Sequence, residues 1–255
     1  MLRWQHRAAR CALAAALVLL LAPSGARAAD APASELSRDQ VEAIVRDYLM
    51  REPEVIYQAL QELQHRQAAE SAERQRKAVA ANRTKLLNDP ASPVGGNPDG
   101  DVTLVEFFDY RCPYCRHVVA SLRELLGDDP ELRIVFKDLP VLGADSVRAA
   151  KAALASRLQD RYVPFHFALM ASEDLSLDGI RATARSVGLD PDRLVADMNA
   201  PEVQRAIDDN YRLAQELGIE GTPAFVIGGQ LIPGAVEKTH LAELIQEART
   251  NCLNC

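Results

Sequence analysis

Two cysteines, Cys112 and Cys115, stand two residues apart in the stretch FFDYRCPYCR. A C-x-x-C pair supports zinc binding, a structural disulfide or reversible thiol–disulfide exchange. Zinc sites commonly pair two such units within roughly 20 residues, whereas 136 residues separate Cys115 from the second unit, Cys252 and Cys255. A disulfide that closes over two intervening residues removes little chain entropy from the unfolded state. The spacing therefore favours redox chemistry, and we expect no metal at Cys112 and Cys115.

The segments around the pair predict how the two thiols differ. Residues 101–110, DVTLVEFFDY, are typical of a strand, and the helical spacing that follows begins at Cys112 or Pro113. A thiol at a helix N-terminus meets unpaired amide groups and the positive end of the helix dipole, which favour the thiolate. We therefore expect Cys112 to be the nucleophile and Cys115, one turn further, to resolve mixed disulfides. The dipeptide Pro113–Tyr114 completes the predicted site but does not by itself set the redox potential.

Two segments carry a family resemblance. EFFDYRCPYC and GTPAFVIGG resemble the active-site segment and the cis-proline loop of the thioredoxin-fold disulfide oxidoreductases related to DsbA. The resemblance covers roughly residues 91–250 and implies an α/β thioredoxin fold with an inserted helical subdomain. It implies that Glu106 is a buried acid beneath the first cysteine. It also implies that Thr222 and the cis-proline Pro223 lie beside the cysteines and bind substrate.

Glu106 and Lys137 each lie within an apolar segment, LVEFF and IVFKD. A buried charge requires a partner, so we include both residues in the predicted site. The carboxylate of Glu106 would then take up the proton that Cys115 loses. The alternative is that strand alternation turns both side chains to water. His117 follows the pair on the helix and is expected to face outward.

The order of predicted elements is that of an α/β protein. Residues 132–141 are typical of a second buried strand, and residues 144–218 show several helical patterns broken by prolines and a Gly-Leu-Asp-Pro turn. Two short apolar runs then flank a Gly-Gly, the signature of a hairpin, and a helix over 237–249 closes the chain. We expect one DsbA-like domain over 91–255, with a helical insertion at about 144–218.

Residues 30–90 form a separate helical region. Apolar residues recur at helical spacing on both sides of Pro53 and fade after Leu63; beyond them, residues 64–85 are strong helix formers with no apolar face. This polar stretch predicts an exposed connecting rod, ended by the Pro- and Gly-rich residues 88–100. The apolar stripe must be covered, either by the same chain or by other copies of it. A long polar rod favours the second option.

AIVRDYLMREPEVIYQALQELQ resembles the N-terminal region of ScsC-like exported proteins. The resemblance implies that residues 38–65 join protomers into a trimer or dimer. With Thr222 before the proline, as in the isomerases of the family, it favours a disulfide isomerase/oxidoreductase that acts on cysteines of exported proteins. A membrane thiol:disulfide redox partner is implied, and no cofactor. The alternatives are a monomeric DsbA-like disulfide oxidase and a copper-binding or copper-tolerance protein.

The first 28 residues predict a secretory signal peptide. Basic residues precede a short apolar run, and Ala26 and Ala28 form an A-x-A-like cleavage site. Loss of the four arginines in residues 1–28 lowers the formal net charge from -7 to -11, which argues against nucleic acid as a partner. We expect a periplasmic location, where disulfides form. The tail pair Cys252 and Cys255 remains open: a frayed end or terminal disulfide, a redox relay, or a Cu(I) site.

Overall fold

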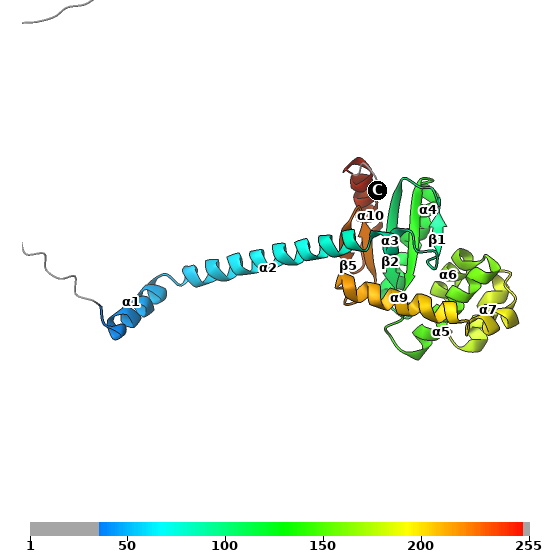
Figure 1. The fold of residues 1–255 in the computed structure, drawn as a ribbon, viewed down its shortest axis with the longest axis horizontal. Helices are drawn as coiled ribbons and strands as arrows, with labels where there is room; N and C mark the ends of the chain where they lie inside the picture. Colours follow the sequence, from blue (N-terminus) through cyan, green and yellow to red (C-terminus); the bar gives the residue numbers. More distant parts are fainter. Residues whose placement is uncertain (1–35, 252–255) are drawn as a thin grey trace, which may run out of the picture. The chain divides into compact units, whose positions relative to one another are not determined.

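The computed structural model describes residues 36–251 (Figure 1). The predicted signal peptide and the pair Cys252 and Cys255 lie outside the described residues. The chain divides into two compact units at the junction of Gln58 and Ala59. No helix in the described part of the chain is long and apolar enough to cross a membrane.

The elements follow the predicted order, with one additional strand. The helices are α1 (Arg38–Arg51), α2 (Glu54–Ala81), α3 (Arg83–Leu87), α4 (Pro113–Asp128), α5 (Ala144–Ala155), the 3₁₀ helix η1 (Ser156–Gln159), α6 (Tyr162–Ala171), α7 (Leu177–Ser186), α8 (Pro191–Asp197), α9 (Pro201–Leu217) and α10 (Lys238–Asn251). The strands are β1 (Val94–Gly96), β2 (Val102–Phe108), β3 (Leu132–Asp138), β4 (Ala224–Ile227) and β5 (Gln230–Pro233).

Local signals account for the two N-terminal helices. Ser37 and Gln40 form a capping box at the start of α1, in which each side chain accepts a hydrogen bond from the other residue's backbone N–H. Pro53 separates α1 from α2 because it cannot continue a hydrogen-bonded helix. The polar stretch of α2 is helical as predicted, but it is not exposed throughout. Near the end of α2, Val79 is only 5% exposed, so the last turns pack against the body.

The sheet has the strand order β1-β3-β2-β4-β5. Strands β2 and β3 are parallel and are joined through α4, whereas β1, β4 and β5 pair antiparallel to their neighbours. The sequence did not predict β1, because its VGG lies among prolines and glycines. Gly96 adopts a φ of +77°, and a Cβ there would lie 2.3 Å from the carbonyl oxygen of Leu132. The strand therefore depends on a residue type that normally marks a turn.

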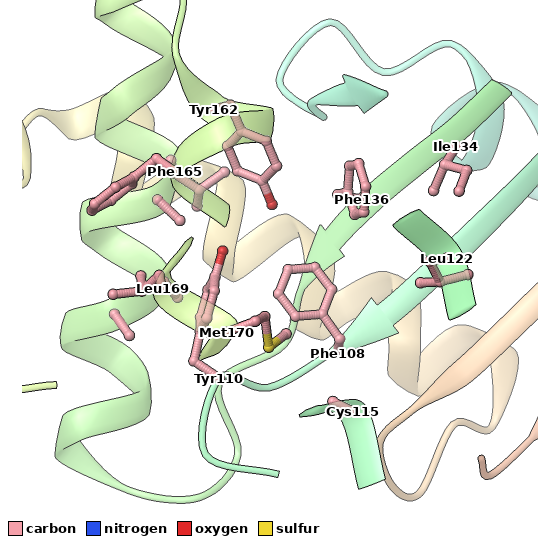
Figure 2. Packing of buried hydrophobic residues seen from close by; sticks show 14 of the residues in the cluster. Phe108, Tyr110, Cys115, Leu122, Ile134, Phe136, Tyr162, Phe165, Leu169 and Met170 are labelled. Atoms are coloured by element: carbon pink, nitrogen blue, oxygen red, sulfur yellow. The ribbon is translucent and has the colours of Figure 1, made fainter. Parts of the chain in front are cut away.

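Strand alternation divides the core into two clusters. One face, here called the cysteine face, packs Leu104 and Phe108 against α4, α10 and the inserted helices. The other, here called the α9 face, packs Val105 and Phe107 against α3, α9 and the end of α2. The inserted helices α5 to α9 lie between β3 and β4, where the sequence predicts them. Figure 2 shows Tyr162 and other residues of this insertion beside β2 and β3 on the cysteine face.

Candidate active site

Cys112 occupies the N-cap of α4, and Pro113 is the first residue of that helix. Proline suits this position because its missing N–H would have no intrahelical partner there. Cys112 is only 4% exposed, and its Sγ donates a hydrogen bond to the carbonyl oxygen of Thr222, 3.2 Å away. The helix begins at Pro113, which is one of the two starting positions that the sequence predicts.

Thr222 and Pro223 directly precede β4, and the peptide bond between them is cis. This agrees with what the family resemblance implied for GTPAFVIGG. The structure thus brings together two segments that are 110 residues apart in the chain. The sulfur of Cys112 thus contacts the residue that precedes the cis-proline.

Cys115 is fully buried one turn into α4 and belongs to the core cluster of the cysteine face. Burial, reinforced by the charge of Glu106, raises the pKa of its thiol far above the usual range. A thiol in this state is a poor nucleophile until a base removes its proton. The division between an attacking Cys112 and a resolving Cys115 stays a prediction.

Glu106 is 1% exposed, so the alternative of a side chain turned to water does not hold. Neither carboxyl oxygen has a hydrogen-bond partner among the described residues. Burial, followed by the charges of Asp138 and Cys112, raises its pKa to about 8. A carboxyl group that holds its proton near neutral pH can exchange it with a thiol.

Lys137 is also buried, at 1% exposure, but the structure does not bring it to the cysteines. It pairs across the strands with Phe107 of the α9 face, so its side chain leaves the sheet opposite to Glu106. Its Nζ donates to Oδ2 of Asp89 at 2.9 Å and to the backbone oxygen of Lys85 at 2.7 Å. The buried ammonium is thus part of an ion pair that anchors the segment after α3.

A second buried acid, Asp138, was missed by the sequence reasoning. It is fully buried, and its Oδ2 accepts a hydrogen bond from the hydroxyl of Tyr162 at 2.9 Å. Burial is the main reason why its pKa rises to about 7. The signal in the sequence was the acid directly after Lys137; without the strand register, the face to which each residue points could not be assigned.

Asp109 is another missed residue, and it positions the active-site turn. Its carboxylate accepts hydrogen bonds from the backbone N–H of Arg111 (2.7 Å) and of Leu142 (2.9 Å) and from the hydroxyl of Ser146 (2.7 Å). Its carbonyl oxygen accepts from the N–H of Cys112 at 3.1 Å. One buried side chain therefore joins the turn before α4 to the loop before α5.

The remaining predicted residues face solvent. Tyr114 is 65% exposed, which places an aromatic ring on the surface between the two cysteines. His117 is exposed and lies 3.9 Å from Glu237, consistent with the expectation that it faces outward. In the part of the chain that the structure describes, no cluster of three or more His, Cys, Asp or Glu side chains is placed to hold a metal ion.

A cavity of about 420 Å³ adjoins the cis-proline loop. Thr222 and Pro223 form part of its lining, and Leu231 of β5 forms another part. The remaining wall comes from α2, through Ser71 and Gln75. Because Thr222 touches the Cys112 sulfur, the cavity begins beside the reactive atom.

Comparison with known proteins agrees with this geometry. A family model described as a DSBA-like thioredoxin domain matches residues 103–246. A second model, described as the N-terminal domain of the copper resistance protein ScsC, matches residues 38–70. The chain spans only about a quarter of the length of the curated Na(+)/H(+) antiporters it matches, such as that of Herminiimonas arsenicoxydans, with 29% identity over 172 residues, 64% of this chain and 27% of the antiporter.

Solved structures are similar to this chain over about two thirds of its length or more. A thioredoxin-like oxidoreductase from Silicibacter pomeroyi is 48% identical over 67% of this chain and 99% of its own, with a TM-score of 0.65. ScsC of Proteus mirabilis in a transitional conformation is 31% identical over 83% of this chain and 96% of its own, with a TM-score of 0.64. A periplasmic thioredoxin-like protein from Salmonella enterica serovar Typhimurium is 33% identical over 66% of this chain and 96% of its own, with a TM-score of 0.61.

Proposed function

We propose that this chain, which belongs to the DSBA-like thioredoxin domain family, is a thiol:disulfide interchange protein that reshuffles disulfides of exported proteins. One observation carries the proposal: Sγ of Cys112 stands at the N-cap of α4, in contact with the residue before a cis-proline. Glu106 lies buried nearby, where the Cys112 charge raises its pKa further. In this proposal Cys112 is the nucleophile, the backbone at Thr222 binds substrate and Glu106 carries the proton.

The reaction begins when the Cys112 thiolate attacks a substrate disulfide. The new S–S bond joins Cys112 to the substrate, and the displaced substrate sulfur leaves with the electron pair. That sulfur can then attack another disulfide of the same chain, which reshuffles the pairing. If the mixed disulfide persists, the carboxylate form of Glu106 takes the proton of Cys115, and the Cys115 thiolate then attacks Cys112 and releases the reduced substrate.

The cavity beside Thr222 is suited to the substrate segments that flank the reacting cysteine. Its polar lining from α2 and its contact with the cis-proline loop fit an extended polypeptide. In this mode the free backbone groups before Pro223 pair with a substrate strand. The predicted signal peptide supports substrates in the periplasm, and a membrane redox partner would keep the cysteine pair in its working state.

The exposed apolar stripe favours an oligomeric isomerase over a monomeric oxidase. Five residues of α1 and early α2, each about half exposed, supply it: Val41, Ile44, Val45, Ile56 and Leu60. Several protomers joined through residues 38–65 would present more than one Cys112 to a single misfolded chain, which raises the effective thiol concentration. The match of residues 38–70 to the ScsC N-terminal domain supports the same conclusion.

Refolding of a substrate with scrambled disulfides tests the function. The mature full-length protein should restore substrate activity, and Cys112→Ser should abolish the effect while the fold remains intact by circular dichroism. The oligomeric mass is measured on the same preparation. A monomer that oxidises reduced substrate but fails to correct scrambled substrate would replace the isomerase with the oxidase.

A further inference from the structure

The buried acids Glu106 and Asp138 lie on the same face of the sheet. Glu106 pairs with Phe136 and Phe108 pairs with Asp138, so Asp138 stands two positions further along the parallel strand β3. With strands about 4.8 Å apart and a rise of about 3.3 Å per residue, their Cα atoms are roughly 8 Å apart. Two carboxylates at such a distance in a dry interior do not both ionise readily.

A chain of hydroxyl groups ends at only one of these acids. The Tyr162 hydroxyl donates to Oδ2 of Asp138, the Tyr110 and Tyr162 hydroxyls share a hydrogen bond, and Nδ1 of His166 lies 3.0 Å from the Tyr110 hydroxyl. Figure 2 shows the two phenol groups pointing toward each other beside Phe108.

The direction of this chain follows from its first bond. Since Tyr162 gives its only hydrogen to Asp138, its oxygen can only accept from Tyr110, and Tyr110 can then only accept from His166. Every donor therefore points toward Asp138 and stabilises its charged form. Glu106 receives no hydrogen bond on either oxygen among the described residues, so it is the acid that holds the proton.

We propose that Asp138, held as an anion by the Tyr162–Tyr110–His166 chain, is the positioning residue that keeps Glu106 protonated for proton donation to Cys115. This inference rests on the proposed thiol–disulfide exchange. In the oxidised protein, an incoming thiolate attacks Sγ of Cys112 and the Cys112–Cys115 bond breaks. The electron pair passes to Cys115, and Glu106 gives it a proton and becomes a carboxylate. The reverse step returns the proton.

Other charged and titratable groups bear on the pair from each neighbouring element. Cys112 and Cys115 approach from α4, Arg157 of η1 lowers the proton affinity of Asp138, and Asp109 after β2 raises it. Tyr162 and His166 belong to α6, and Arg123 of α4 acts on His166. The Lys137 ammonium does not act on Glu106 or Asp138, because its side chain points to the α9 face of the sheet.

The test follows the reaction of the oxidised full-length protein with dithiothreitol from pH 5 to 10, with rate constants corrected for the thiolate fraction of the reagent. The corrected rate should fall as pH rises through the pKa of Glu106, which burial and the charge of Asp138 raise above its ordinary value. This fall is the descending limb of the pH–rate profile. Asp138→Asn removes the neighbouring charge, so the limb should move toward acid by about one pH unit. Tyr162→Phe should move it in the same direction, because Asp138 then competes for the shared proton.

Coupling between the variants separates this role from a structural one. The double variant Asp138→Asn/Tyr162→Phe should show the same limb as Asp138→Asn alone, since an amide has no charge for Tyr162 to stabilise. In a Glu106→Gln background the limb should be absent, and Asp138→Asn should move nothing. Tyr211→Phe is the matched control, because Tyr211 donates to the backbone oxygen of Pro140 beyond β3 and should leave the limb in place.

Each of the following outcomes overturns one part of the proposal. If the limb stays at its wild-type pH in both Asp138→Asn and Tyr162→Phe, the inference is overturned. If it moves only in Asp138→Asn, the role of the hydroxyl chain is overturned. If the wild-type disulfide does not react with dithiothreitol any faster than an unstrained small-molecule disulfide, the proposed function fails instead.

Discussion

The sulfur of Cys112 donates a hydrogen bond to the carbonyl oxygen of Thr222, 3.2 Å away, across 110 residues of sequence. This contact places the reactive atom against the backbone that precedes Pro223. Under the proposed function, a substrate cysteine joined to Cys112 would lie beside Thr222, with its flanking residues directed toward the adjoining cavity.

Cys115→Ser is expected to trap substrates as mixed disulfides. Cys112 would still attack, but no thiol would remain one turn further in α4 to release the partner. Covalent complexes should accumulate on non-reducing gels and disappear on reduction. Cys112→Ser/Cys115→Ser is the control and should trap nothing; complexes formed by that double variant would assign the attack to a different cysteine.

Substitutions in the part of the cavity wall that α2 contributes should slow the reaction of large substrates only. Replacement of Ser71 or Gln75 by Trp would fill the space beside Thr222, so reaction with a cysteine-containing peptide should slow by about tenfold, the equivalent of about 1.4 kcal/mol. Reaction with dithiothreitol should stay within twofold. Gln67→Trp, at an exposed position of the same helix, is the control. Equal peptide rates in all three variants would show that substrates bind elsewhere.

Glu106 should make the reduced protein less stable as pH rises. Its pKa is about 8 in the fold against a reference value of 4.5, so the folded state binds the proton more tightly. The corresponding stability is fully present below pH 4.5 and is lost as pH rises through about 8, a change on the order of 5 kcal/mol. Urea unfolding of wild type and Glu106→Gln at several pH values measures it. Parallel curves for the two proteins would contradict this assignment.

We expect the ion pair of Lys137 and Asp89 to stabilise the fold and to have no role in thiol–disulfide exchange. Asp89→Asn leaves a buried ammonium without its charge partner and should cost about 3–5 kcal/mol of unfolding free energy. Lys137→Met should cost less, because Asp89 keeps contact with water at 22% side-chain exposure. The dithiothreitol reaction of Lys137→Met should match wild type at 15 °C, where the variant remains folded. A change in the pH at which the dithiothreitol rate falls would show that Lys137 acts on the active site.

Ile44→Asp together with Ile56→Asp is expected to give a monomer. Each side chain is about half exposed within its own chain, and a carboxylate in an apolar interface would be desolvated without a partner. Light scattering after size exclusion measures the mass. Met50→Asp, at a position that is 78% exposed and outside the stripe, should retain the wild-type mass. A wild-type monomer would contradict the predicted oligomer.

The sequence predicted those parts of the fold that depend on local pattern. Helical spacing located α1, α4 and α10, and the apolar run around Glu106 located β2. The position of Cys112 at the start of a helix also followed from local signals, since Pro113 is suited to the first turn. These features depend on neighbours within a few residues.

The errors and omissions concern features that depend on register. Lys137 and Asp138 are adjacent in sequence but leave β3 on opposite faces, and only the pairing of Glu106 with Phe136 decides which faces the cysteines. Tyr162 and His166 could not be linked to the site either, because the inserted helices bring them there from another part of the chain. Strand β1 was missed since its glycines are also typical of a loop.

Burial of Val79 and Leu86 on the α9 face limits how the chain can be shortened. Composition changes at about residue 88, and a fragment that begins there would appear to contain the whole catalytic body. It would instead uncover Val105, Phe107 and Val135 of the sheet, an apolar surface prone to aggregation. A soluble minimal enzyme must therefore retain the last turns of α2, and its N-terminal boundary falls inside a helix and not at a linker.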